Sequence, residues 1–221
     1  MRNSECWYVD VCPITDKCNP YCIRYVSMKY LMEHSNIPKS RWKPQVLKPP
    51  KCDYDAFCRL ADIKDDIQQF IKDGKSLYIT STNTGNGKTT WAIKLLTRYF
   101  DRVWAGNGIE RIRGLFIHVP TFLLKCKEFG KNDPEFEEIK ANLSTVDVVV
   151  WDDIASTEIS AYDCSQLLMY IDARVSGNLS NIYTGNLNNP ESMKKAIGAK
   201  LTSRVWSSDT EIVEFVGGDK R

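Results

Sequence analysis

The chain has 221 residues and a formal net charge of +2, a length that fits one good hydrophobic core with a small appendage. The near-neutral charge excludes a protein that is basic throughout, so any contact with nucleic acid must come from a local patch. No apolar run reaches the ~20 residues that a membrane helix needs, and no secretory signal follows Met1, so we expect a cytoplasmic protein without a membrane partner.

The first 22 residues contain four cysteines with the spacing C-x5-C-x5-C-x3-C: Cys6, Cys12, Cys18 and Cys22. Four thiolates suit a tetrahedral Zn²⁺ site, and metal–ligand bonds would stabilise a segment that is too short to form its own core. The spacing lacks the C-x2-C pairs of common zinc ribbons. An iron–sulfur cluster or plain buried thiols are therefore the alternatives.

A helix is predicted to follow the cysteines, because apolar residues recur at helical spacing from Ile23 to Leu31. Residues 35–52 are rich in proline and basic residues, which is typical of a linker. We therefore expect a cysteine-rich module over residues 1–34 and a main domain over residues 53–221. Asp53 is expected to cap the first helix of that domain, and Gly74 to end it.

The stretch from Thr82 to Thr90 lies between an apolar strand candidate and a helix candidate. Small residues there allow backbone N–H groups to surround a polyphosphate, and the helix directs its positive end at the same anion. Lys88 would reach the β- and γ-phosphates of a nucleotide, and the Thr89 hydroxyl would bind Mg²⁺. The first glycine of the usual pattern is Thr82 here, and a simple polar turn is the alternative. The predicted nucleotide-binding residues are Asn83, Thr84, Gly85, Asn86, Gly87, Lys88, Thr89 and Thr90.

A helix with a buried apolar stripe is predicted after this loop, followed by a strand over residues 115–119. Pro120 suits the first turn of the next helix. Its inward positions include Phe122 and Leu123, while Lys125 and Lys127 point elsewhere. These two lysines could contact DNA phosphates, although a solvated helix face is the alternative.

Residues 146–151 are nearly all apolar and end at Asp152 and Asp153. This pattern predicts a parallel strand that is buried on both faces and delivers carboxylates at its C-terminal edge. In P-loop ATPases the first such acid holds Mg²⁺ and the second polarises the attacking water. We therefore assign Asp152 to the metal and Asp153 to the general base, with a pair of capping aspartates as the alternative.

The last third of the chain predicts a helix from about Ala161 to Gly177, a short strand over 181–184, one helix over 192–206 and a final strand over 211–216. Asn186 follows the short strand and is expected to orient the attacking water and sense the γ-phosphate. A turn asparagine is an equally good interpretation there. Arg204 is expected to project outward from the helix over 192–206.

The order of these parts resembles the AAA+ replicative helicase loaders, the DnaC-like and DnaI-like ATPases of bacteria and phages. The resemblance rests on residues 85–89, 148–154, 184–187 and 201–205, extends to residues 35–38, and covers most of residues 35–216. It implies an α/β P-loop NTPase fold of the AAA+ (ASCE) type, with a parallel sheet flanked by helices and no C-terminal lid domain. By position, Asp152 and Asp153 match the Walker B pair, Asn186 the sensor 1 residue and Arg204 the arginine finger.

The resemblance implies an ATP-dependent helicase loader that acts in DNA replication, with weak ATPase activity that DNA or a partner stimulates. ATP and Mg²⁺ would bind between the subunits of a homo-oligomer, either a ring or an open spiral. The oligomer would contact single-stranded DNA through the region of Lys125 and Lys127, and also contact the replicative helicase. The cysteine cluster is similar to the zinc-bearing, helicase-contacting end of the DnaI-like branch, but it is far shorter.

Two alternatives remain at this point. One is a transposition-regulating AAA+ ATPase that coats duplex DNA. The other is a zinc-dependent adaptor that binds nucleotide without hydrolysing it. The small size and short N-terminal segment favour a phage or a mobile element as the source, in which case the host cytoplasm is the expected location.

Overall fold

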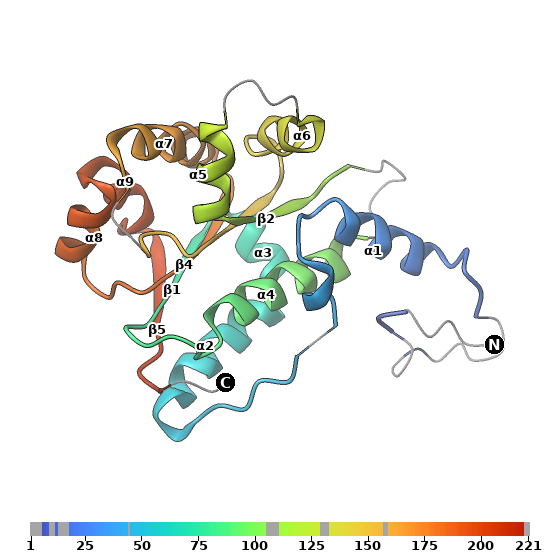
Figure 1. Cartoon of the computed structure of the whole chain (residues 1–221). Helices are drawn as coiled ribbons and strands as arrows, with labels where there is room; N and C mark the ends of the chain where they lie inside the picture. Colours follow the sequence, from blue (N-terminus) through green and yellow to red (C-terminus); the bar gives the residue numbers. More distant parts are fainter. Residues whose placement is uncertain are drawn as a thin grey trace.

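The computed structural model describes residues 6–8, 12, 18–43, 45–104, 111–128, 133–156 and 159–218 (Figure 1). In this described part, parallel strands form one sheet in the order β2-β3-β4-β1-β5. The strands are β1 (Ser76–Thr80), β2 (Gly114–His118), β3 (Val148–Asp152), β4 (Ser180–Gly185) and β5 (Thr210–Glu214). All strands run in the same direction, so their carboxyl ends meet at one edge. The sequence-based prediction of an α/β fold with a parallel sheet flanked by helices is confirmed.

Helices cover both faces of the sheet, which makes three layers (Figure 1). Successive strand residues point to opposite faces, so Leu77 and Ile79 enter one hydrophobic core while Tyr78 enters the other. The first core lies against α1 (Ile23–Glu33), α2 (Tyr54–Asp65), α3 (Ile67–Lys72) and α4 (Lys88–Val103). The second lies against α5 (Val119–Lys127), α6 (Pro134–Asn142), α7 (Ala161–Ser176), α8 (Pro190–Ile197) and α9 (Ala199–Val205).

Three local predictions were wrong. The single helix expected over residues 192–206 is two helices, because Gly198 has a φ of 79° and interrupts the helical backbone. The helix expected to run from Asp53 to Gly74 is likewise divided into α2 and α3 at Asp66. Asp53 does not cap α2 with its side chain. Its Oδ1 instead accepts hydrogen bonds from the backbone N–H of Val216 at 2.8 Å and of Gly217 at 3.0 Å, which fixes the chain after β5.

The helix predicted after the cysteines is confirmed as α1, and it packs against α4 through the first core. Its buried residues are Tyr25, Met28, Leu31 and Met32. Two of the apolar residues that indicated this helix, Ile23 and Val26, are 72% and 40% exposed. The apolar residues of α1 therefore line two faces, and only one of them is covered within the described part of the chain.

The predicted zinc site is not supported by the structure. Within the described ranges, which include all four N-terminal cysteines, no group of three or more His, Cys, Asp or Glu residues could hold a metal ion. Cys6 and Cys12 pack against the first hydrophobic core, while Cys22 is exposed at the start of α1. The four thiols therefore do not converge on a common centre.

The linker is anchored along the free edge of β2. Ser35 accepts a hydrogen bond from the backbone N–H of Phe116 at 2.7 Å, and the Asn36 side-chain amide donates to the Phe116 carbonyl at 2.9 Å. The short turns η1 (Lys39–Arg41) and η2 (Lys51–Asp53) then lead to α2. This contact covers an edge strand that would otherwise expose unpaired backbone groups.

In the described residues, no helix has the length and apolar character needed to cross a bilayer.

Candidate nucleotide-binding site

The loop between β1 and α4, where we predict phosphate binding, contains two glycines with a left-handed backbone. Gly85 has a φ of 71° and Gly87 a φ of 97°, a left-handed region that glycine enters without steric cost. Thr82 is not among the described residues with positive φ, so the loop conformation does not require glycine at that position. Thr82 therefore replaces a glycine that the backbone does not need, and glycine occupies both left-handed positions of the loop.

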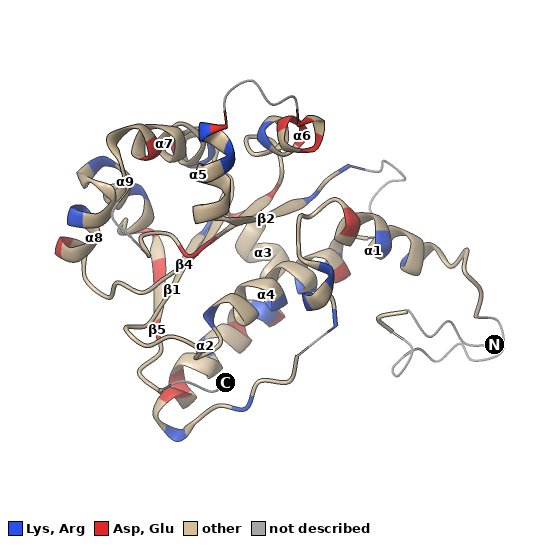
Figure 2. Cartoon of the chain, viewed as in Figure 1, with Lys and Arg blue, Asp and Glu red and all other residues tan. Residues whose placement is uncertain are grey.

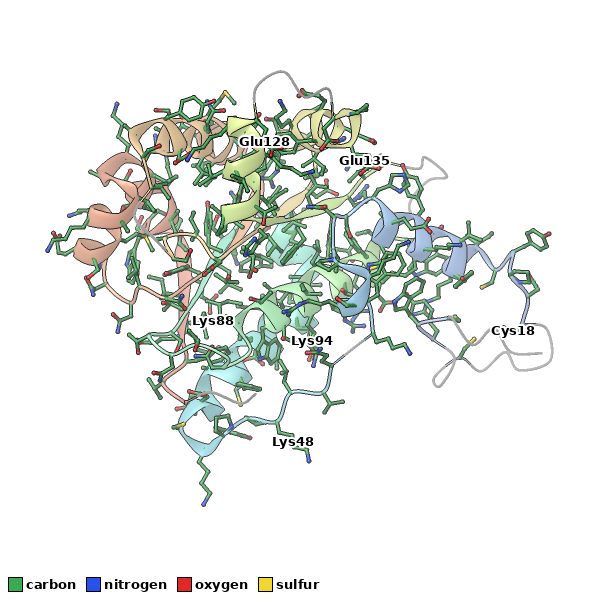
Figure 3. The ribbon with its side chains drawn as sticks, in the orientation of Figure 1. Cys18, Lys48, Lys88, Lys94, Glu128 and Glu135 are labelled. Atoms are coloured by element: carbon green, nitrogen blue, oxygen red, sulfur yellow. The ribbon has the colours of Figure 1, made fainter. Side chains whose placement is uncertain are left out.

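Lys88 begins α4 and turns back into the loop. Its Nζ donates hydrogen bonds to the Asn83 carbonyl at 3.0 Å and to Asn86 Oδ1 at 3.3 Å, and the residue is only 8% exposed. Burial lowers the pKa of Lys88, and the negative charges of Asp153 and Asp152 oppose that shift. Figure 3 labels Lys88 at the start of α4. An anion beside this ammonium group would compensate for its loss of hydration.

Asp152 ends β3 and is almost fully buried, with 5% of the residue exposed. The Thr184 hydroxyl on β4 donates to Asp152 Oδ1 at 2.7 Å. Burial raises the pKa of Asp152, while hydrogen bonds from Thr184 and Thr89 oppose the shift. The hydroxyl of Thr89 and the carboxylate of Asp152 are therefore neighbours. Oxygen ligands of these two kinds fit Mg²⁺, which prefers a carboxylate, a hydroxyl and phosphate oxygens.

Asp153 follows in a backbone conformation that few residues adopt. Its φ is 62°, and Ala155 two residues later has a φ of 63°. The Asp153 N–H donates to Thr184 Oγ1 at 2.9 Å, and the Ile154 N–H donates to the Thr184 carbonyl at 2.9 Å. Strained backbone of this kind persists where neighbouring contacts hold it, often at functional sites. Thr184 thus fixes both aspartates at the carboxyl edge of the sheet.

Asn186 lies just beyond β4, at the same edge. The next residue, Leu187, is held by two hydroxyls of β1: Tyr78 donates to the Leu187 carbonyl at 2.8 Å and Thr80 donates to it at 2.7 Å. Burial raises the pKa of Tyr78 to about 12, so its hydroxyl stays protonated and remains a donor at neutral pH. These contacts anchor the turn that presents the Asn186 amide.

The phosphate loop, the two aspartates and Asn186 line one cleft of about 790 Å³. That volume suits a nucleotide-sized ligand. Figure 2 shows that most charged residues lie on the helices and loops, whereas the strands are mostly uncharged apart from acidic residues at the end of β3 and on β5. The cleft-lining residues are Pro38, Ser40, Arg41, Gln45, Leu47, Thr84, Gly85, Asn86, Gly87, Lys88, Thr89, Thr90, Phe116, His118, Asp152, Asp153, Thr184 and Asn186.

The other predicted site residues lie outside this cleft. Arg204 is on α9, and its Nε donates to Asp172 Oδ1 at 2.6 Å. Lys125 pairs with Asp133 at 2.9 Å and Lys127 with Asp163 at 2.7 Å. Asn83 also does not line the cleft wall. Its side-chain amide donates to the carbonyls of Val216 and Gly217, which ties the loop to the chain after β5.

Sequence reasoning missed several residues of the cleft. His118 ends β2 and pairs in register with Asp152, and its position at the end of a parallel strand was a usable signal. Thr184 is a buried polar residue near the carboxyl end of β4, and that position was a similar signal. Arg41 and Gln45 come from the linker, and no local pattern shows that the linker folds over the phosphate loop.

The sequence matches no protein-family model and no curated protein. Solved structures do match it. A crystal structure of the DnaC helicase loader has a TM-score of 0.65 at 18% identity, over 80% of this chain and 99% of that one. A crystal structure of DnaI has a TM-score of 0.62 at 16% identity, over 85% of this chain and 95% of that one. The replication initiator DnaA, bound to AMPPCP and single-stranded DNA, has a TM-score of 0.57 at 13% identity, over 79% and 50% of the two chains.

These likenesses confirm the predicted resemblance at the level of the fold. The chain has the fold seen in the structures of DnaC and DnaI. At 18% identity and below they show the fold alone, so the activity has to be argued from the site itself.

Proposed function

We propose that this protein is an ATP-dependent helicase loader. The observation that carries the proposal is the single cleft in which the phosphate loop, Lys88, two adjacent aspartates and Asn186 meet. The similarity of the fold to DnaC and DnaI supports the loader role over other uses of the same loop. The DnaA structure with AMPPCP and single-stranded DNA supports a nucleotide and a DNA strand as ligands.

In the proposed reaction, backbone N–H groups of residues 84–88 surround the phosphates, and the Lys88 ammonium neutralises charge on the β- and γ-phosphates. Thr89 and Asp152 would hold Mg²⁺, which supplies charge neutralisation along the triphosphate. Asp153 takes a proton from the attacking water, and Asn186 orients that water. The Thr184 hydroxyl holds the Asp152 carboxylate, and its hydroxyl and carbonyl oxygens hold the backbone of Asp153 and Ile154.

Arg204 is proposed to act in a neighbouring copy of the chain. It does not line the cleft of its own chain, and its side chain is 43% exposed. An arginine finger supplied by a second subunit would stabilise charge that develops on the γ-phosphate. Hydrolysis then requires a homo-oligomer, as a ring or an open spiral.

The remaining assignments follow the same proposal. Residues 53–221 form the ATPase domain, residues 35–52 connect it, and residues 1–34 contact the helicase. The exposed side chains of Tyr21, Ile23 and Val26 on and before α1 support that contact. Single-stranded DNA would meet α5, where Lys125 is the more available lysine because its partner Asp133 is exposed. Lys127 instead pairs with Asp163, which is almost fully buried and caps α7.

Arg204→Ala tests the shared site. We expect ATP turnover by the assembled protein to fall to background while nucleotide affinity is retained, because the substituted residue is outside the cleft of its own chain. Phosphate release and isothermal titration with a slowly hydrolysed ATP analogue measure the two quantities. Loss of nucleotide affinity in Arg204→Ala would show that Arg204 is structural. The proposed ATPase activity would be contradicted if the unmodified protein, with DNA and helicase present, released phosphate only at the background rate.

A further inference from the structure

Arg204 and Asp172 form an ion pair between two adjacent helices. Helices α7 and α9 lie side by side (Figure 1). Arg204 is in the last turn of α9, and Asp172 is on α7. The distance from Arg204 Nε to Asp172 Oδ1 is 2.6 Å, and the two side chains are 43% and 45% exposed. This distance is short for a charge-assisted hydrogen bond, and both groups remain open to a second molecule.

The pair uses only one edge of the guanidinium group. Nε makes the hydrogen bond, whereas the terminal Nη1 and Nη2 make none to the residues that the structure describes. Arginine binds phosphate through two N–H groups of its planar fork, and the two terminal nitrogens form one such edge. Asp172 can therefore hold Arg204 without occupying the edge that a γ-phosphate would take.

Both helices are firmly attached to the domain. α7 begins with a capping box formed by Ser160 and Asp163, and it buries Leu167 and Ile171 completely. α9 buries Leu201, Thr202 and Val205. A free arginine side chain has many rotamers, and ordering it during catalysis costs conformational entropy. A carboxylate on a rigid neighbouring helix removes part of that cost before the second subunit arrives.

We propose that Asp172 is a positioning residue for Arg204. It holds the guanidinium so that Nη1 and Nη2 face the nucleotide in the cleft of a neighbouring copy of this chain. This inference rests on the proposed function, because it requires Arg204 to act between subunits. It goes further by assigning to α7 a residue that touches neither ATP nor Mg²⁺ and acts only through Arg204.

The first test compares steady-state ATP hydrolysis by the full chain with that of Asp172→Asn. We expect kcat to fall about fivefold, the rate equivalent of about 1 kcal/mol from one exposed ion pair. KM for ATP and the affinity for the slowly hydrolysed analogue should not change, because Asp172 lies outside its own cleft. Asp172→Glu should recover most of the rate, because glutamate restores the carboxylate that pairs with Arg204. If Asp172 only filled space, restoring the carboxylate would not matter.

Glu191→Gln is the matched control. It breaks the exposed ion pair between Glu191 and Lys194 on α8, whose distance is 2.7 Å, and leaves the Arg204 pair intact. We expect its kcat to equal that of the unmodified protein. An equal loss in Glu191→Gln and Asp172→Asn would overturn the inference. So would an unchanged or faster turnover in Asp172→Asn, because Asp172 would then be neutral or would compete with the phosphate.

A subunit-mixing experiment separates this inference from the function on which it rests. Lys88→Ala chains cannot hold ATP but keep Asp172 and Arg204, so adding them should restore turnover to Arg204→Ala chains and to Asp172→Asn chains. Adding Arg204→Ala chains should not restore turnover to Asp172→Asn chains. If Lys88→Ala fails to rescue Arg204→Ala, the shared ATPase site is wrong. Suppose that Lys88→Ala chains rescue Arg204→Ala chains, but Asp172→Asn chains either have normal turnover or are not rescued. Then only the role of Asp172 is wrong.

Discussion

Asp153 combines a proposed chemical role with an unusual backbone. With a φ of 62°, it occupies a region that aspartate and asparagine enter more easily than most residues. Asp153→Asn therefore changes the chemistry without changing the fold, because asparagine lacks the basic carboxylate but enters the same left-handed backbone region. The consequences for turnover and for folding can then be told apart.

We expect Asp153→Asn to lower kcat for ATP hydrolysis by about 10²–10⁴-fold, the usual contribution of a general base. Nucleotide affinity and thermal stability should stay close to those of the unmodified protein. Phosphate release, titration calorimetry and a melting curve measure the three quantities. Asp209→Asn, which changes an exposed carboxyl outside the cleft, serves as the control. Undiminished turnover in Asp153→Asn would remove this residue from the chemistry.

Asp152 should lower the free energy of unfolding of the nucleotide-free protein at neutral pH. Burial raises its pKa above the ordinary value, so the folded state binds a proton more readily than the unfolded state does. The contribution of Asp152 to stability is therefore greatest below its unfolded pKa of ~4 and is lost as the pH rises through its folded pKa. A functional carboxylate that is kept ionised in a buried site commonly has this cost.

Asp152→Asn should raise the free energy of unfolding at pH 7 by about 1 kcal/mol, or about 2–4 °C in Tm for a chain of this size. Asparagine can still accept the hydrogen bond from Thr184 through its Oδ1. The gain should shrink toward pH 4, where the aspartate becomes neutral. Melting curves at several pH values without nucleotide measure it, and a variant that is less stable at pH 7 would contradict the account.

At the level of elements, one buried arginine connects α7 to the sheet. Arg174 is fully buried and donates to Asn181 Oδ1 and to backbone carbonyls, among them those of Leu143, Val146 and Ser180. Burial lowers the pKa of Arg174 to about 10, which still leaves it charged at neutral pH. This side chain thus fixes the segments that lead into β3 and β4, whose far ends carry Asp152 and Asn186.

Arg174→Met should lower the free energy of unfolding by about 3 kcal/mol or more, because each buried acceptor left without a donor costs about 1–3 kcal/mol. Urea unfolding followed by circular dichroism measures the change. Arg102→Met, at an exposed position on α4, should shift it by less than about 0.5 kcal/mol. If the two variants are equally stable, the Arg174 network does not hold the sheet and the helices together.

The sequence predicted the elements better than it predicted their ends and exposed faces. Apolar runs identified β1, β2 and β3 to within a few residues, because strands buried on both faces are mostly apolar. β5 was identified by its alternation of apolar and polar residues instead. The breaks at Asp66 and Gly198 were missed, since a single residue in a helical pattern does not show how the chain turns. The exposed Ile23 and Val26 were ambiguous because periodicity does not say which apolar face is covered.

At the scale of the whole molecule, the candidate site was predictable where its residues follow a strand. Lys88, Asp152 and Asn186 come together because parallel strands end at one edge. Two features depend on tertiary packing between distant segments. One is the side of the cleft formed by Arg41 and Gln45 of the linker, and the other is the pairing of Arg204 with Asp172. The zinc prediction is not supported in the described residues, because cysteine spacing alone does not determine whether thiols converge.

The most direct test of the loader account is native mass spectrometry of the full chain mixed with a bacterial replicative helicase and a slowly hydrolysed ATP analogue. We predict a discrete complex with several copies of this chain on each helicase hexamer, and its loss with Lys88→Ala, which removes the phosphate-binding ammonium group. Self-association alone, or assembly only on duplex DNA, would contradict the helicase loader and favour a transposition-regulating ATPase of the same fold.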